Sequence, residues 1–111
     1  MSMKAEIYGA LAATGIPGRF EAYAVGRAPA PPFFIYEVRD WGEIYADGTT
    51  YARTPHVHVE LFEKVSDSGA EEKMRQAIET AFGPVEETGA WSQSEDCHIE
   101  QYDFTYTGGK A

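Results

Sequence analysis

The segment of residues 31–64 constrains the fold of this chain more than any other part. Two prolines precede an apolar run at residues 33–36, and an alternating run follows at residues 57–62. Between them Ala46-Asp47-Gly48 is a turn signal, because Asp-Gly suits the positive φ values of tight hairpins. The segment therefore predicts a hairpin, and it supplies no catalytic group.

The two strands of this hairpin are predicted at residues 33–39 and 56–64. Side chains alternate between the faces of a strand, so the second strand is half-buried. Its apolar side chains all fall on one face: Val57, Val59 and Leu61. Its opposite face carries the polar side chains and one aromatic: His56, His58, Glu60 and Phe62.

Two amphipathic helices are predicted. The first covers residues 3–14 and ends at Gly15, which fits the left-handed position after a helix. The second begins at a capping box from Ser68 to Glu71, and Glu71 is expected to pair with Arg75 one turn later. The apolar stripe of the second helix has the spacing of a core-facing surface: Met74, Ala77, Ile78, Ala81 and Phe82.

Further strands are predicted at residues 19–25, 85–88 and 98–106, with a proline-rich loop before the central hairpin. The order is therefore helix, strands, helix, strands. This order favours a single α+β domain over residues 1–107, with a mostly antiparallel sheet and two helices packed on one face. Residues 108–111 are expected to form a flexible C-terminal tail.

Composition narrows the possible functions. The chain has 111 residues, one domain by length, and 43% of them are hydrophobic, which favours a globular fold. Its 18 acidic and 9 basic residues give a net charge of −9, which argues against gripping DNA through phosphates. No apolar run approaches the ~20 residues of a membrane span. We expect no secretory signal and a reduced, cytoplasmic setting.

Aromatic residues are frequent, at 14% of the chain. They favour strands, but Tyr, Trp and Phe are also enriched where proteins contact each other. Composition therefore leaves two interpretations open: an aromatic-rich sheet, and a surface that contacts another protein.

His56, His58 and Glu60 form the main chemical alternative. Because alternate residues of a strand project to one side, these side chains could chelate one metal ion, and His98 from another strand could add a ligand. The simpler interpretation is that they belong to the solvent or interface face of a half-buried strand. We therefore assign neither a metal nor a cofactor.

Enzymatic activity is not predicted. Cys97, the single cysteine, could act as a nucleophile with His98 as its base. Adjacent residues of a strand point to opposite faces, however, so these two side chains are not expected to pair. The chain also has no G-x-S-x-G, P-loop or G-x-G-x-x-G motif.

Taken in order, these elements resemble a family of small phage and prophage proteins, the tail-completion or tail-terminator proteins of long-tailed phages. The resemblance begins at the helix stop Gly15-Ile16-Pro17 and continues with Pro31-Pro32-Phe33-Phe34-Ile35-Tyr36. Tyr45-Ala46-Asp47-Gly48 resembles the family's Ala-Asp-Asn turn, and Val59-Glu60-Leu61-Phe62 resembles its Ile-Glu-Leu-Tyr strand. An acidic helix and a closing strand with Tyr102, Phe104 and Tyr106 complete it.

The resemblance implies a structural protein without catalytic residues. Such proteins form a ring of identical subunits, commonly a hexamer, at the head-proximal end of the tail tube. One side of the contact between subunits is assigned to the segment around the hairpin turn: Trp41, Ile44, Tyr45 and Tyr51. The ring stops polymerisation of the tube protein and offers a surface to the head connector or head-closure protein, while DNA passes through its lumen without being read. The implied location is the virion, and the bacterial host cytoplasm during assembly.

Other functions stay open from the sequence. The chain could be another head–tail joining or minor tail protein. It could be a small metal-binding protein or enzyme that uses His56, His58 and Glu60. A stand-alone binding module of the bacterial host is the third alternative.

Overall fold

The computed structural model describes the chain except residues 1–2, 25, 42–44, 47–48, 51–53 and 107–111. For residues 40–41, 45–46, 49–50 and 54 it describes the backbone alone. The elements in chain order are α1 (Met3–Ala12), β1 (Gly18–Phe20), β2 (Phe33–Trp41), β3 (Tyr45–Ala46), β4 (Thr49–Thr50), β5 (Thr54–Glu63), α2 (Ser68–Phe82), β6 (Glu86–Ser92) and β7 (Cys97–Thr105).

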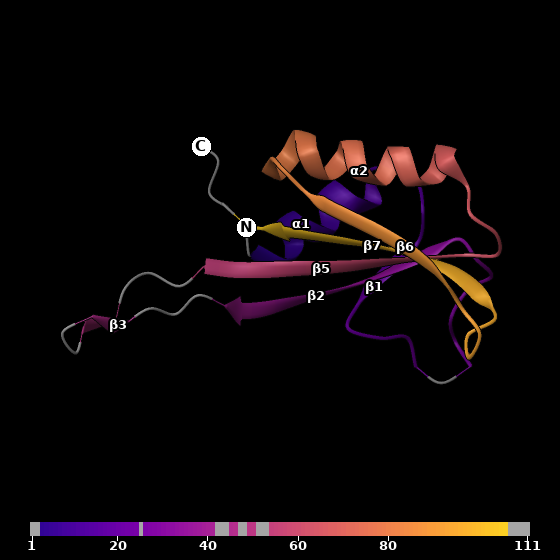
Figure 1. Ribbon diagram of the computed structural model, residues 1–111, viewed down its shortest axis with the longest axis horizontal. Coiled ribbons are helices and arrows are strands. Elements are labelled where there is room, and N and C mark those ends of the chain that lie inside the picture. The colour runs from indigo at the N-terminus through magenta and orange to yellow at the C-terminus, as the bar shows by residue number, and fades with distance from the viewer. Residues whose placement is uncertain (1–2, 25, 42–44, 47–48, 51–53, 107–111) are drawn as a thin grey trace.

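A five-stranded sheet of order β1-β2-β5-β7-β6 organises the fold, and both helices lie on the same face of it (Figure 1). All of its strand pairs are antiparallel except the short parallel pair of β1 and β2. The predicted class is thus confirmed: a single α+β domain with a mostly antiparallel sheet. β3 and β4 form a separate two-stranded sheet.

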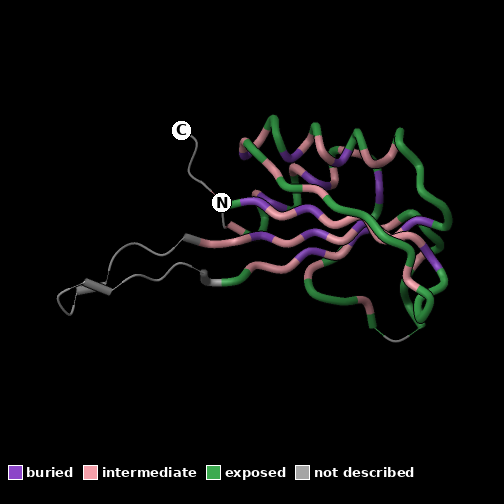
Figure 2. The backbone as a smooth tube through the Cα atoms, viewed as in Figure 1, coloured by how far each residue is buried: buried purple, intermediate pink, exposed green. Residues whose placement is uncertain are grey.

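The centre of the sheet is the long pairing of β5 with β2 on one side and with β7 on the other. β2 pairs with β5 from Phe33↔Phe62 to Trp41↔Thr54, without interruption. The predicted alternation is confirmed along β5, where Val57, Val59 and Leu61 are fully buried. Figure 2 shows the same alternation along the neighbouring strands.

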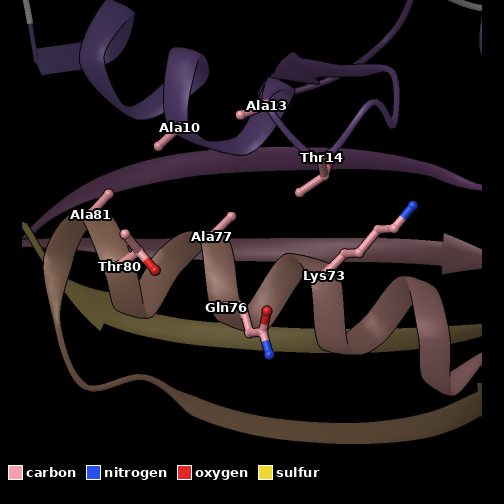
Figure 3. A pocket seen from close by; sticks show the side chains of 8 residues that line it. All are labelled: Ala10, Ala13, Thr14, Lys73, Gln76, Ala77, Thr80 and Ala81. Atoms are coloured by element: carbon pink, nitrogen blue, oxygen red, sulfur yellow. The ribbon is translucent and has the colours of Figure 1, made fainter.

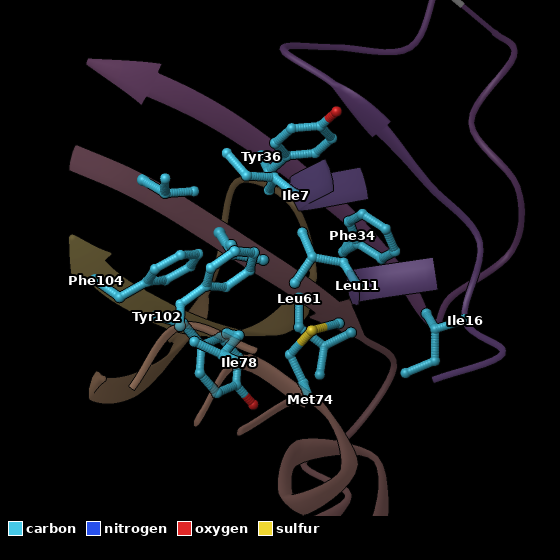
Figure 4. Close-up of a cluster of buried hydrophobic side chains, with 13 residues drawn as sticks. Ile7, Leu11, Ile16, Phe34, Tyr36, Leu61, Met74, Ile78, Tyr102 and Phe104 are labelled. Atoms are coloured by element: carbon cyan, nitrogen blue, oxygen red, sulfur yellow. The ribbon is translucent and has the colours of Figure 1, made fainter. Parts of the chain in front are cut away.

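The hydrophobic core fills the space between the sheet and the two helices (Figure 4). Ile7 and Leu11 enter it from α1 and are fully buried. The predicted stripe of α2 is confirmed, since Met74, Ile78 and Phe82 are buried and its two alanines are partly buried. The Phe82 ring stacks on Phe104 of β7, with ring centroids 5.1 Å apart.

Several element boundaries differ from the prediction. α1 ends two residues early, because the Thr14 hydroxyl donates to the Leu11 carbonyl and Gly15 has a φ of 84°. β1 is shorter than predicted, because the positive φ of Glu21 turns the chain away from β2. β5 begins before Pro55, whose carbonyl accepts from the Tyr106 backbone N–H across the sheet.

The N-terminus of α2 also differs from the predicted capping box. Its N-cap is Asp67, whose carboxylate accepts from the N–H groups of Gly69 and Ala70. Glu71 reciprocates, as its place in the predicted box implies, since its Oε2 accepts from the Asp67 N–H. The N-cap thus lies one residue before the predicted one. The predicted pairing of Glu71 with Arg75 is wrong: the Arg75 guanidinium contacts Glu72 and Glu79 instead.

The side chains assigned to the predicted subunit interface lie outside what the structure describes. β3 pairs with β4 in the register Ala46↔Thr49, and the predicted turn at Asp47-Gly48 lies outside the described residues. Ile44 and Tyr51 lie outside the described residues, and the structure describes only the backbone of Trp41 and Tyr45. The interface assignment therefore stays a prediction, as does the tail of residues 108–111.

Gly18 and Gly9 give a matched test of the packing between β1 and β2. A Cβ on Gly18 would lie 2.2 Å from the Phe34 ring, which is fully buried and cannot move aside, whereas Gly9 in α1 has nothing within 4 Å. We expect Gly18→Ala to lower the free energy of unfolding by about 1–3 kcal/mol. Gly9→Ala should raise it by up to about 1 kcal/mol through helix propensity. Urea denaturation measures both, and equal stabilities would contradict this packing.

Candidate functional site

The alternation of the strands sorts the polar side chains onto two faces of the sheet. One face lies under the helices. The other, which we call the open face, is left uncovered by them (Figure 1). Its side chains come from alternate positions of β2, β5 and β7, and among those described Cys97 alone is buried. They are Phe33, Ile35, Glu37, Arg39, His56, His58, Glu60, Phe62, Cys97, Ile99, Gln101, Asp103 and Thr105.

Two histidines share one carboxylate on the open face. His56 Nε2 lies 2.9 Å from Asp103 Oδ1, and His58 Nδ1 lies 2.8 Å from the same oxygen. His58 Nε2 also reaches Glu60 Oε2 at 3.4 Å. Burial acts to raise the pKa of Asp103, but the hydrogen bonds with His58 and His56 outweigh it and lower the pKa. The two imidazoles are thus held by a carboxylate that the sequence reasoning did not identify.

The predicted metal site is only partly assembled. The structure places His56, His58 and Glu60 on one face, as expected. Their ring nitrogens and carboxylate oxygens do not all lie within 4.8 Å of one another, however. His98 lies on the other face of the sheet, under the helices. His98 and Asp103 are an odd number of positions apart along β7, so their side chains lie on opposite faces of the sheet. The expectation that His98 could complete this site is therefore wrong.

A second cluster lies on the helix side of the sheet, and we call it the carboxylate cluster. It consists of Glu63, Glu71, His98 and Glu100. Glu63 ends β5, Glu71 lies in the first turn of α2, and the other two occupy alternate positions of β7. One nitrogen or oxygen from each residue lies within 4.8 Å of the others. Within the described part of the chain, it is the one group of at least three His, Cys, Asp or Glu residues that meets this distance.

Three members of the carboxylate cluster are held by hydrogen bonds or ion pairs. His98 Nε2 lies 2.7 Å from Glu100 Oε1 and 3.6 Å from Glu71 Oε2. Glu71 Oε2 also accepts from the Ser66 hydroxyl at 2.8 Å and from the Asp67 N–H at 3.2 Å. The cap of α2 therefore orients Glu71 toward β7.

Glu63 is the exception. It is only 2% exposed, and neither of its oxygens has a hydrogen-bond partner of good geometry among the described residues. Burial, together with the adjacent Glu71 carboxylate, raises its pKa to about 8. The nearby Glu87 on β6 behaves similarly, since burial and the Glu100 carboxylate raise its pKa to about 7. Burial also acts to raise the pKa of Glu71. The adjacent Glu63 carboxyl and the hydrogen bonds from Ser66 and the Asp67 N–H outweigh burial and lower this pKa.

The open face is apolar at the end where β5 finishes. The Phe33 ring stacks on Phe62 at 4.8 Å, and Tyr23 from the preceding loop packs edge-on against Phe33 at 5.5 Å. Cys97 lies beside this stack, buried, and burial raises the pKa of its thiol. Its neighbour His98 lies on the opposite face, as predicted, so the two do not form a nucleophile–base pair. Phe33, Phe62 and Cys97 belong to the lining of a groove of about 410 Å³. All of its lining residues are Ala30, Pro31, Phe33, Phe62, Lys64, Glu95, Asp96 and Cys97.

A further groove, of about 570 Å³, lies between the two helices (Figure 3). Small side chains predominate in it, and Lys73 is its one ionisable residue: Ala10, Ala13, Thr14, Lys73, Gln76, Ala77, Thr80 and Ala81. It therefore lacks the paired groups that acid–base catalysis requires.

Comparisons of the chain with protein-family models, with curated proteins and with solved structures find no match. Among the described residues, no helix has both the length and the apolar character needed to cross a membrane.

The buried Glu63 carboxyl should make stability depend on pH. The unfolded chain releases this proton near pH 4.5, whereas the folded protein keeps it to about pH 8. Between these values the folded state binds more protons, so stability falls as pH rises, by up to about 1.4 kcal/mol per unit. Glu63→Gln, which stays neutral, should reduce this slope and leave the smaller contribution of Glu87.

Urea denaturation at several pH values between 5 and 8, in metal-free buffer, measures this slope. Glu86→Gln, an exposed substitution on β6, serves as the matched control and should keep the wild-type slope. A Glu63→Gln variant with an undiminished slope would show that Glu63 is ionised in the folded protein.

Proposed function

We propose that this chain is a structural phage or prophage protein, a tail terminator that forms a ring, caps the tail tube and joins it to the head. Two lines support this proposal: the ordered resemblance of the sequence, and a fold of the small α+β class that the resemblance implies. The observation that carries it is a sheet covered by helices on one face only. Such a sheet keeps one face and two edges for contacts with other proteins.

A closed ring needs heterologous contacts, in which two different surfaces of the subunit meet head to tail. The two edges of this sheet are unlike each other. β1 covers β2 only from Phe34 to Tyr36, so residues 37–41 of β2 have no strand beyond them among the described residues. At the opposite edge, β6 pairs with β7 alone. Exposed strand edges are templates for pairing with another chain, so these two edges supply the two different surfaces.

The open face has the composition of a protein contact. Phe33, Phe62 and Ile99 form an apolar row across β2, β5 and β7. The rows beyond it carry polar and charged groups, including the two histidines held by Asp103. An apolar patch bordered by polar groups is typical of interfaces between proteins. We assign this face to the contact with a second copy of the chain.

The remaining parts of the proposal concern partners. The ring contacts the tail tube protein on one side and the head connector or head-closure protein on the other. The net charge of −9 suits a lumen through which DNA slides without being gripped. The protein has no catalytic activity in this role, and it belongs to the head-proximal end of the tail after assembly in the bacterial cytoplasm.

The open face gives the sharpest test of the ring. In native mass spectrometry over a concentration series, the wild-type protein should form a closed ring of about six subunits. Ile99→Glu places a charge in the apolar row and should weaken association at least about tenfold, because a buried unpaired charge is costly.

Val65→Glu is the matched control, since Val65 is 67% exposed in the loop before α2, away from the open face. It should assemble like the wild-type protein, and circular dichroism should show all three proteins folded. If Ile99→Glu assembles as well as the wild type, the assignment of the open face fails. A wild-type protein that stays monomeric even with the tail tube protein of the same genome would overturn the ring itself.

A further inference from the structure

We propose that the carboxylate cluster binds one divalent transition-metal ion, for which Zn²⁺ is the best fit. The ion would lie on the helix side of the sheet, held by Glu63 of β5, Glu71 of α2, and His98 and Glu100 of β7. This inference is independent of the proposed function, since it concerns the single subunit.

The donor set selects the class of ion. One imidazole and three carboxylates suit Zn²⁺, which is bound by His nitrogen and by Asp or Glu oxygen in tetrahedral sites. Mg²⁺ and Ca²⁺ prefer oxygen ligands throughout, so the imidazole argues for a transition metal. The four donor atoms lie within 4.8 Å of one another without an ion. Bound to Zn²⁺ at about 2.0–2.2 Å, they would stand roughly 3.3 Å apart, so contraction needs only small rotations of side chains.

Glu63 supplies a second, independent observation. Buried carboxyl groups are normally hydrogen-bonded, paired with a cation or bound to a metal. Glu63 is 2% exposed, and both of its oxygens are without a partner of good geometry in the described part of the chain. Its carboxyl group points into the cluster, where the nearest charged groups include another carboxylate. The Glu71 carboxylate and the Asp67 N–H come near these oxygens, but neither makes a well-aligned hydrogen bond with them. A metal ion would give both oxygens a partner.

Gly89 shows how closely the backbone approaches these ligands. It lies in β6 opposite Glu100, and glycine inside a strand marks a place where other groups come near the backbone. A Cβ at Gly89 would lie 2.1 Å from Glu100 Oε1 and 2.9 Å from His98 Nε2. The absence of a side chain here thus makes room for two of the proposed ligands.

Acidic side chains outnumber basic ones around the cluster, which favours the binding of a cation. Glu87 adds a further carboxylate next to Glu100. Among the described basic groups, Arg75 approaches this side, with its Nε 3.6 Å from Glu87 Oε1, and it also contacts Glu72 and Glu79. A divalent ion would supply positive charge where the carboxylates converge. It would also fix the first turn of α2 to β5 and β7.

Titration of the chelator-treated, purified protein with Zn²⁺ in a calorimeter tests the proposal. We expect a single ion per chain. Glu63→Gln and His98→Ala should each weaken binding at least about tenfold, as loss of a ligand does. Zn²⁺ at a hundredfold excess over Kd should raise the Tm of the wild type by on the order of 10 °C, and should raise the Tm of Glu63→Gln much less.

His58→Ala is the matched control, because it removes a histidine from the open face and should leave Zn²⁺ binding unchanged. In the NMR spectrum of the wild type, Zn²⁺ should shift the ring signals of His98 and spare those of His56 and His58. Three results would overturn the proposal: no stoichiometric binding, tighter binding of Mg²⁺ or Ca²⁺ than of Zn²⁺, or binding lost in His58→Ala but kept in Glu63→Gln. Each can be read whether or not the subunits form a ring.

Discussion

The alternation of side chains along β5 is the constraint on which the rest of the structure depends. β5 lies in the middle of the sheet, paired along its length with both β2 and β7. Its fully buried residues Val57, Val59 and Leu61 give the two helices a surface to cover. A slip of one residue would exchange the two faces and bury His56 and His58 in place of the valines. The register that forms the core therefore also fixes which polar groups reach the open face.

The same alternation explains the carboxylate cluster. The face that buries Val57 and Leu61 continues to Glu63, where the hydrophobic layer gives way to the first turn of α2. The chain thus places a carboxyl group in a buried position that an apolar residue would fill more stably. Glu71 is turned toward it by the cap of the helix, and β7 brings His98 and Glu100 from the other side. Four residues from three elements meet because β5 ends close to the start of α2, and β7 lies beside both.

Sequence reasoning recovered what depends on local pattern. The faces of β5, the stripe of α2 and the helix stop at Gly15 follow from spacing and from glycine's access to positive φ. It missed the polar clusters, because these depend on the register of β7 against β5. Asp103 meets the histidines, and His98 faces away from them, only once that register is known. The N-cap of α2 was predicted one residue too late, at Ser68 instead of Asp67. Both residue types are good N-caps, and only the geometry chooses between them.

We propose two roles for opposite faces of one sheet: assembly through the open face and edges, and binding of a cation that stabilises the subunit on the helix side. In the first role the chain ends a tail tube. Electron microscopy of particles from a genome in which the gene is deleted is the decisive test of this role. We expect tail tubes of irregular, excessive length without attached heads, restored to uniform, joined tails when the gene is supplied again. Joined tails of normal length in the deletion would contradict it.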